Sequence, residues 1–229
     1  MKIILFGATG MVGQGVMREC LLDPEVTQLL TVGRHATNQQ HPKLRELVVP
    51  DLFDLSSTEQ QLAGFDACFF TLGTSAVGLT EAQYARVTCD LTLAVARTLV
   101  RLNPGMTFIY VSGMGTDSSE RGRVMWARVK GRTENALLAL GFRRAFMFRP
   151  GAIVPLHGIR SRTLAYRVGY MLMAPVLPLL RRLFPKAVTT TEIVGRAMIA
   201  VAERGNKQAV LESADINRVA FAAGAATAR

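Results

Sequence analysis

Short apolar runs alternate along this chain with longer amphipathic stretches, and Gly, Pro and Asp residues separate them. The apolar runs predict strands at Lys2–Phe6, Gln28–Val32, Glu46–Val49, Ala67–Thr71, Thr107–Val111, Arg144–Phe148 and Gln208–Leu211. The amphipathic stretches predict helices at Met11–Leu22, Ser57–Leu62, Thr80–Leu102, Arg123–Leu140 and Thr189–Glu203. Several strands are almost wholly apolar, which is typical of strands covered on both faces. The pattern therefore predicts an α/β protein with a doubly wound parallel sheet and helices on both faces.

A glycine-rich turn follows the first predicted strand. Gly7, Gly10 and Gly13 stand at three-residue intervals, from just after that strand into the first turn of the first predicted helix. In such a strand–turn–helix unit, the first glycine permits the tight turn, the second lets backbone approach a pyrophosphate, and the third lets helix and strand pack closely. The N–H groups at the helix start then face the anion. The turn predicts a dinucleotide site; a structural turn without a ligand is the alternative.

Composition narrows the class of protein. The chain has 229 residues, 49% hydrophobic and 19% charged, which suits a single domain over residues 1–229. Its net charge is +10, but no compact Lys/Arg run or aromatic-interleaved basic stripe accompanies it, so we do not expect nucleic-acid binding. Cys20, Cys68 and Cys89 lack metal-ligand spacing. We therefore predict no metal site and read the cysteines as reduced thiols of a cytoplasmic protein.

The segment 157–186 departs from the alternating pattern, because it is basic, apolar and aromatic together. Within it Val168–Leu180 carries no charge, is too short to span a bilayer and is interrupted by two prolines. We expect a helical elaboration over a substrate cleft or in a dimer interface. Peripheral membrane contact is the less favoured alternative, with basic residues at the rim of the apolar face. Those residues are Arg160, Arg162, Arg181, Arg182 and Lys186.

The carboxyl ends of the predicted strands supply candidate cofactor ligands, because open α/β sheets bind ligands there. Arg34 follows the second strand, where an NAD site would hold an acidic residue. A guanidinium pairs well with a 2′-phosphate, so we predict NADP(H) in preference to NAD(H), a solvated surface arginine being the alternative. Asp51 is expected to accept a hydrogen bond from the adenine amino group. The predicted cofactor-binding residues are Gly7, Thr9, Gly10, Met11, Val12, Gly13, Arg34, Asp51, Leu52, Leu72, Gly73, Thr74, Lys130, Pro150, Gly151 and Ile153.

Further motifs accompany the glycine turn. They are Gly33-Arg34, Asp51-Leu52, Val111-Ser112, Lys130-Gly131-Arg132-Thr133-Glu134, Arg149-Pro150-Gly151 and Thr189-Thr190-Thr191-Glu192. Over nearly its whole length the chain thereby resembles the atypical short-chain dehydrogenase/reductase superfamily. It is most similar to the small branch of Tat-interacting-oxidoreductase-like and sugar-nucleotide-epimerase-like proteins. This resemblance implies a Rossmann sheet of strand order 3-2-1-4-5-6 with a seventh strand, NAD(P) binding and oxidoreductase activity.

In that superfamily a serine and a Tyr-x-x-x-Lys pair carry out the chemistry. The resemblance implies Ser112 and Lys130 as catalytic residues here, but Trp126 stands where the tyrosine would be. An indole N–H donates a hydrogen bond without ionising near neutral pH. It can hold a carbonyl in place but cannot act as a general acid.

Other side chains are weaker candidates for the missing proton donor. Tyr110 is expected in the core, Tyr84 at a contact between helices, and His157 in a loop near the substrate side. Two hypotheses therefore stand. One is a weakly active NADPH-dependent reductase of an unknown small carbonyl or alcohol; the other is a non-catalytic NADPH-binding regulator or scaffold. Monomer and homodimer both remain open.

Overall fold

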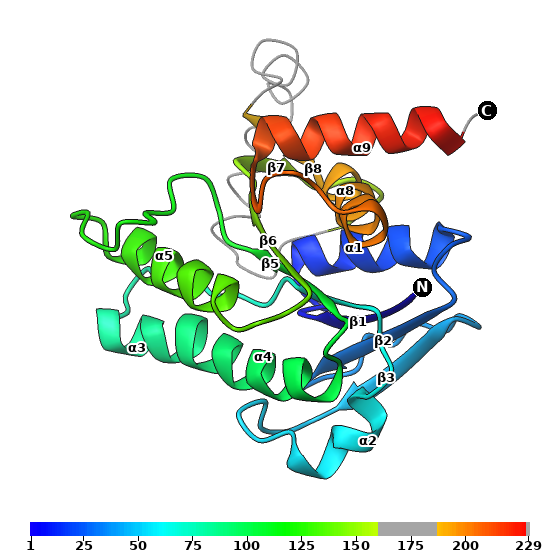
Figure 1. Cartoon of the computed structure of the whole chain (residues 1–229), viewed down its shortest axis with the longest axis horizontal. Helices are drawn as coiled ribbons and strands as arrows, with labels where there is room; N and C mark the ends of the chain where they lie inside the picture. Colours follow the sequence, from blue (N-terminus) through cyan, green and yellow to red (C-terminus); the bar gives the residue numbers. More distant parts are fainter. Residues whose placement is uncertain (160–186, 228–229) are drawn as a thin grey trace.

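Parallel strands form the central sheet of the protein, whose computed structural model describes residues 1–159 and 187–227 (Figure 1). The neighbouring strands follow the order β3-β2-β1-β4-β5-β6-β9, which confirms the predicted topology and makes β9 the seventh strand. All the strand pairs are parallel, so all carboxyl ends lie at one edge. The strands are β1 (Lys2–Phe6), β2 (Gln28–Gly33), β3 (Leu44–Val48), β4 (Ala67–Phe70), β5 (Thr107–Val111), β6 (Arg144–Arg149) and β9 (Val210–Glu212).

Helices cover both faces of the sheet. On one face lie α1 (Met11–Leu22), α8 (Thr191–Arg204) and α9 (Ser213–Thr227), and on the other α2 (Glu59–Leu62), α4 (Leu91–Leu102) and α5 (Met125–Leu138) (Figure 1). Side chains of a strand point alternately to the two faces. In β1, Leu5 therefore packs in the core on the α1 side and Phe6 in the core on the α4 side, both fully buried. Two cores explain why β1, β4 and β5 are almost wholly apolar.

The stretch predicted as one helix over Thr80–Leu102 has an interruption. It comprises α3 (Glu81–Ala85), a π-helical turn (Arg86–Asp90) and α4. Thr80 caps α3 by accepting from the Gln83 N–H, and the Gln83 side chain accepts from the Thr80 N–H in return. Single π turns occur often near functional sites.

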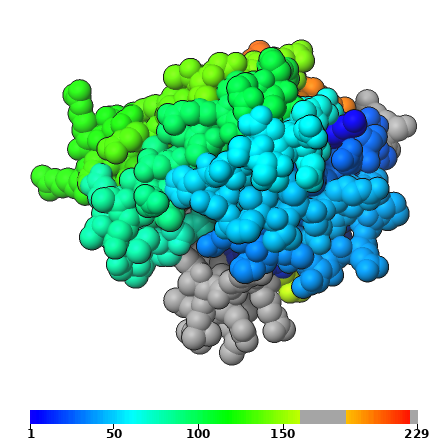
Figure 2. Space-filling view, turned by 90° about the horizontal axis from the view of Figure 1, so that it is seen from below, coloured from blue at the N-terminus to red at the C-terminus, as the bar shows by residue number. Residues whose placement is uncertain are grey.

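On the surface in Figure 2, the β2–α2 region (blue to cyan) borders the α3–α4 region (turquoise to green).

Other differences from the predictions involve short or late elements. A 3₁₀ turn (Ser56–Thr58) precedes α2 where one helix was predicted, and α5 is shorter than expected. Neither α9 nor the parallel pair β7 (Ala152–Val154) and β8 (Val188–Thr190) was predicted from the sequence. The residues of β8 overlap the start of a predicted helix, because Thr190 is in fact the N-cap of α8.

The elaboration predicted at 157–186 lies outside the described residues except for 157–159. The uncharged stretch Val168–Leu180 and its basic rim are therefore not placed. Across the part of the chain that is described, no helix has the length and apolarity needed to cross a membrane. Within the same ranges, no group of His, Cys, Asp or Glu side chains is arranged to hold a metal ion.

Candidate functional site

The glycine turn between β1 and α1 uses its three glycines differently. Gly7 has a φ of +87°, and a Cβ there would lie 2.6 Å from the Leu72 nitrogen. A Cβ at Gly13 would overlap the Gly7 carbonyl oxygen, so Gly13 allows the close packing of helix on strand. Gly10 has an ordinary extended conformation, and a Cβ there would contact only the Gly7 oxygen, at 3.3 Å. The fold thus requires Gly7 and Gly13, whereas Gly10 leaves room at the start of α1.

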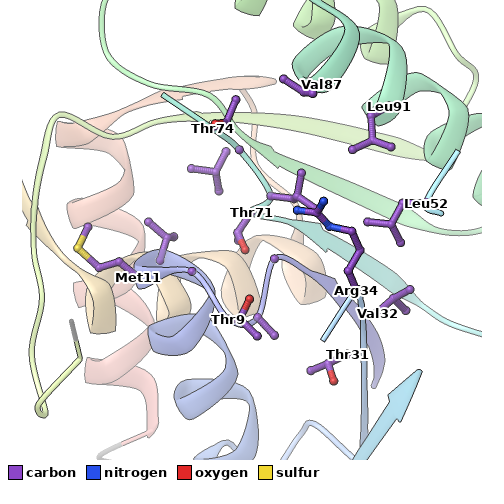
Figure 3. Close-up of a pocket in the computed structure, with 18 of the residues that line it drawn as sticks. Thr9, Met11, Thr31, Val32, Arg34, Leu52, Thr71, Thr74, Val87 and Leu91 are labelled. Carbon is purple, nitrogen blue, oxygen red and sulfur yellow. The ribbon is translucent and has the colours of Figure 1, made fainter. Parts of the chain in front are cut away.

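That helix start opens into a cavity of about 1080 Å³. Gly10 is the N-cap of α1, no side chain caps the helix, and no acidic residue lies in its first turn. Unpaired backbone N–H groups at such an end favour an anionic ligand. The cavity lies at the carboxyl edge of the sheet, where the order reverses between β1 and β4. Figure 3 shows Thr9, Met11, Thr71 and Thr74 around it.

The cavity brings together almost all of the predicted site residues. Gly13 is the exception, since it packs beneath the turn. The predicted residues that line the cavity are Gly7, Thr9, Gly10, Met11, Val12, Arg34, Asp51, Leu52, Leu72, Gly73, Thr74, Ser112, Trp126, Lys130, Pro150, Gly151 and Ile153.

One end of the cavity follows β2 and β3. Arg34 extends its guanidinium into it, between Thr71 and Leu52 in the view of Figure 3. Among the described residues no hydrogen bond or ion pair holds Arg34, so its charge is available to a ligand. Asp51 uses one carboxylate oxygen to accept from the Phe53 N–H, at 2.9 Å, which leaves the other oxygen for a ligand.

The sequence did not point to Glu46, which lines this end of the cavity from β3. Its carboxylate accepts from the backbone N–H of Thr37, at 2.7 Å, and from the Thr37 hydroxyl. Thr37 therefore engages an acidic side chain near Arg34. The prediction that no acidic residue faces the cofactor considered only the turn after β2. The pairing of β3 with β2 brings the acidic Glu46 to the same end of the cavity.

The other end of the cavity lies between β5 and α5. Lys130 donates from Nζ to the Ser112 carbonyl oxygen, which joins the two elements. Burial lowers the pKa of Lys130 to about 8, while the nearby charge of Glu134 acts in the opposite direction. The Ser112 hydroxyl donates to Glu134 rather than into the cavity. Trp126 lines the cavity one helical turn before Lys130.

A buried ion pair lies behind these residues. Glu134 is 1% exposed and is paired with Arg149 of β6, which binds both carboxylate oxygens. Arg149 also donates to the Ser118 hydroxyl, at 2.5 Å. Sequence reasoning did not assign a role to either residue. The spacing could have indicated a contact, because Glu134 is four residues after Lys130 and lies on the same face of the helix.

The loop before α5 is fixed by its own hydrogen bonds. Asp117 accepts from the Gly122 N–H at 2.6 Å and from Ser119, and the hydrogen bond from Ser119 is the main reason that its pKa is lowered. A Cβ at Gly131 would overlap the Asp117 carbonyl oxygen. The glycine after Lys130 therefore lets the loop pack against α5, and this packing holds Trp126 and Lys130 at the cavity.

The loop after β6 and the two-stranded sheet β7–β8 form the wall of the cavity that contains Pro150, Gly151 and Ile153. Gly151 donates its N–H to the Ser213 hydroxyl at 2.5 Å, and Pro150 accepts from the Met114 N–H at 2.9 Å. Ile153 follows in β7, which pairs with β8. These contacts join the loop after β5 to the start of α9.

The weaker candidates for a proton donor lie elsewhere. Tyr110 is buried in the α4-side core, and burial raises its pKa further above the ordinary value. Tyr84 is buried where α3 packs near α5. His157 binds Glu192 at 2.8 Å and lines a separate cavity beside α1. None of the three lines the main cavity. The three cysteines are free and buried.

Curated proteins of fungi are similar to this chain. It is 31% identical to protein fmp52 of Emericella nidulans over 159 residues, 66% of each protein. It is 30% identical to FMP52 of Eremothecium gossypii over 156 residues, 67% of each. With fmp52-2 of Aspergillus oryzae it shares 27% over 230 residues, 94% of this chain and 95% of that protein. The first two matches thus span about two thirds of the relatives' length. No protein-family model matches the chain.

The names of these relatives overturn one prediction. Each is called mitochondrial. The prediction of a cytoplasmic protein is therefore wrong by this comparison. It rested on cysteine usage, which distinguishes oxidising from reducing surroundings and does not distinguish among reducing ones.

Solved structures share the fold. An oxidoreductase of the short chain dehydrogenase/reductase family from Burkholderia thailandensis has a TM-score of 0.66 at 15% identity, covering 92% of this chain and 89% of that one. Bordetella bronchiseptica WbmF, in complex with NAD⁺, gives 0.65 at 15%, covering 97% and 78%. The carbonyl reductase Sniffer of Drosophila melanogaster gives 0.65 at 14%, covering 93% and 97%. At the level of the fold, these structures confirm the predicted resemblance.

Proposed function

This chain belongs to the Fmp52 family, and we infer that it is an NADP(H)-binding oxidoreductase-like protein acting on a small carbonyl or alcohol. The observation that carries this inference is the single cavity that joins the uncapped start of α1, the unpaired Arg34 and the Ser112–Lys130 contact. In a phosphorylated nicotinamide dinucleotide, the helix start suits the pyrophosphate, Arg34 the 2′-phosphate, and Lys130 the nicotinamide ribose.

The residues present fit such a cofactor. A Cβ at Gly10 would fill space beside the uncapped helix start, which suits the close approach of a pyrophosphate. Gly73 and Gly113 also line the cavity, and a Cβ at either would meet nothing within 4 Å. Bare backbone therefore borders the cavity on three sides, after β1, β4 and β5.

We propose a preference for NADP(H) because of Arg34. A planar guanidinium binds phosphate oxygens through two parallel hydrogen bonds. Among the described residues, Glu46 is the only acidic residue of β3 that lines the cavity. The Thr37 hydroxyl and N–H both donate to its carboxylate, which reduces its repulsion of a bound phosphate. NADH offers a ribose hydroxyl here and gains less from Arg34.

The bound cofactor would supply the hydride, and the protein would position and polarise the substrate. Lys130 would hold the nicotinamide ribose, and Trp126 would donate a hydrogen bond to a substrate oxygen from its indole N–H. Because Trp126 does not ionise, we expect weak reductase activity. The same residue favours a second candidate function, a protein that binds NADPH and regulates a partner without chemistry.

Direct binding and turnover distinguish these functions. Isothermal titration with NADPH and with NADH measures the affinities, and NADPH oxidation against a panel of aldehydes, ketones and quinones measures turnover. NADPH binding with slow turnover supports the reductase, and binding without turnover of any compound supports the regulator. Failure to bind either dinucleotide would reject both.

A further inference from the structure

The end of the cavity between β5 and α5 holds few groups that can give up a proton. The ionisable side chains that line the cavity among the described residues are Arg34, His35, Glu46, Asp51 and Lys130. The first four follow or belong to β2 and β3, on the far side of the glycine turn. Lys130 alone belongs to α5 and bonds to the end of β5.

Neighbouring groups are unsuited to proton donation for reasons visible in their contacts. The Ser112 hydroxyl donates away from the cavity, to Glu134. Glu134 is buried and accepts from Arg149 as well. Trp126 faces the cavity but holds its N–H proton far too tightly to transfer it.

The protonated Lys130 side chain has more N–H donors than its one hydrogen bond uses. An ammonium group carries three N–H donors, and one of these is directed to the Ser112 carbonyl oxygen. Two remain for the cavity, one for the nicotinamide ribose and one for a substrate oxygen. The elements packed around it carry other ionisable groups, which are Arg128, Arg132 and Glu134 on its own helix, Arg144 and Arg149 on β6, Tyr110 on β5, and Glu81, Tyr84, Arg86, Cys89 and Asp90 before α4.

Burial is the main influence on this lysine. It lowers the pKa from 10.5 to about 8, with Glu134 opposing the shift. An acid with a pKa near the working pH transfers its proton most effectively. The buried position thus makes the ammonium a better acid than a solvated lysine would be.

We propose that Lys130 itself gives the proton to the substrate oxygen in this protein, in place of the residue at position 126. This inference rests on the proposed reductase function. With the cofactor bound, the carbonyl carbon would accept a hydride from the reduced nicotinamide as the C=O π bond breaks. Its electron pair takes a proton from Lys130 Nζ, giving the alcohol, the oxidised cofactor and a neutral amine. Water then returns a proton to the amine.

The first test follows Lys130 without turnover. Protein labelled with ¹³C at lysine Cε is titrated by NMR with and without NADPH, and the Lys130 resonance is assigned by its absence in Lys130→Arg. We expect a midpoint near 8. A midpoint at the ordinary lysine value in both states would overturn the proposal.

The second test uses 9,10-phenanthrenequinone as the carbonyl probe. We expect kcat to fall as pH rises through about 8, because the ammonium loses its proton. Lys130→Arg keeps the positive charge but not a transferable proton, so kcat should fall roughly 10²–10⁴-fold. Lys207→Arg, at an exposed site outside the cavity, is the matched control.

The outcomes separate the two claims. A Lys130→Arg variant that keeps its turnover, a flat pH profile, or no quinone reduction by protein that binds NADPH would each overturn the role of Lys130. Failure of the natural protein to bind NADPH in the parallel titration would instead reject the proposed function.

Discussion

Replacing Arg34 by alanine tests the cofactor preference with little effect on the fold. Arg34 is exposed, and among the described residues it makes no ion pair or hydrogen bond. Surface substitutions of this kind usually change stability by less than about 0.5 kcal/mol. Any large change in binding therefore reports on the ligand.

The magnitude follows from the chemistry of the pair. A hydrogen bond to a charged group contributes about 1.5–3 kcal/mol, and roughly 1.4 kcal/mol corresponds to a tenfold change in affinity. Arg34→Ala should raise the Kd for NADPH roughly ten- to hundredfold. We expect the lower part of this range, because the site is open to solvent and Glu46 lies in the same cavity. The Kd for NADH should change little.

The assay is a titration of each dinucleotide at low and at high salt, followed by calorimetry. Arg34→Lys should give an intermediate loss, since an ammonium lacks the planar pair of donors. Arg97→Ala, an exposed arginine of α4 outside the cavity, should change neither affinity. Equal affinities for NADPH and NADH in the natural protein, or equal losses for both in Arg34→Ala, would refute the reasoning.

Three further substitutions test other parts of the site. Gly10→Val should abolish NADPH binding with a near-native circular dichroism spectrum, whereas Gly13→Ala should itself lower the melting temperature; binding by folded Gly10→Val would contradict the assignment of the turn. Trp126→Tyr restores an ionisable hydroxyl and should raise kcat by roughly 10²-fold at most, because Lys130 already gives a proton in the natural protein; high natural turnover that is insensitive to this position would show that Trp126 does not limit the rate. Arg149→Met leaves Glu134 buried without its partner and should cost about 3–5 kcal/mol in urea unfolding, partly recovered by adding Glu134→Gln; an unchanged urea midpoint would show that the pair does not stabilise the fold.

Much of the fold could be predicted from the sequence because its signals are local. The apolar run before Gly7 and the amphipathic run after Gly10 determine a strand, a turn and a helix within a few residues. Parallel pairing then brings the ends of β1, β2, β4 and β5 to one edge, so residues after separate strands line one cavity.

The missed elements other than α9 are short. β7 and β8 have only three residues each and exist as a pair. The π turn at Arg86–Asp90 has helical composition and differs from an α-helix only in its hydrogen bonding. Neither has a periodicity long enough to recognise.

The sequence by itself determined the identity of the chemical groups: three glycines in a turn, an arginine after β2, and a tryptophan one helical turn before a lysine. Only the tertiary structure decided what those groups are free to do. The Ser112 hydroxyl is turned inward because Glu134 and Arg149 meet behind it, and the pKa of Lys130 is lowered to about 8 because the packing of α5 against β5 buries much of its side chain. A proton's availability depends on burial and on hydrogen-bond partners, and both arise when α5 packs against β5 and β6.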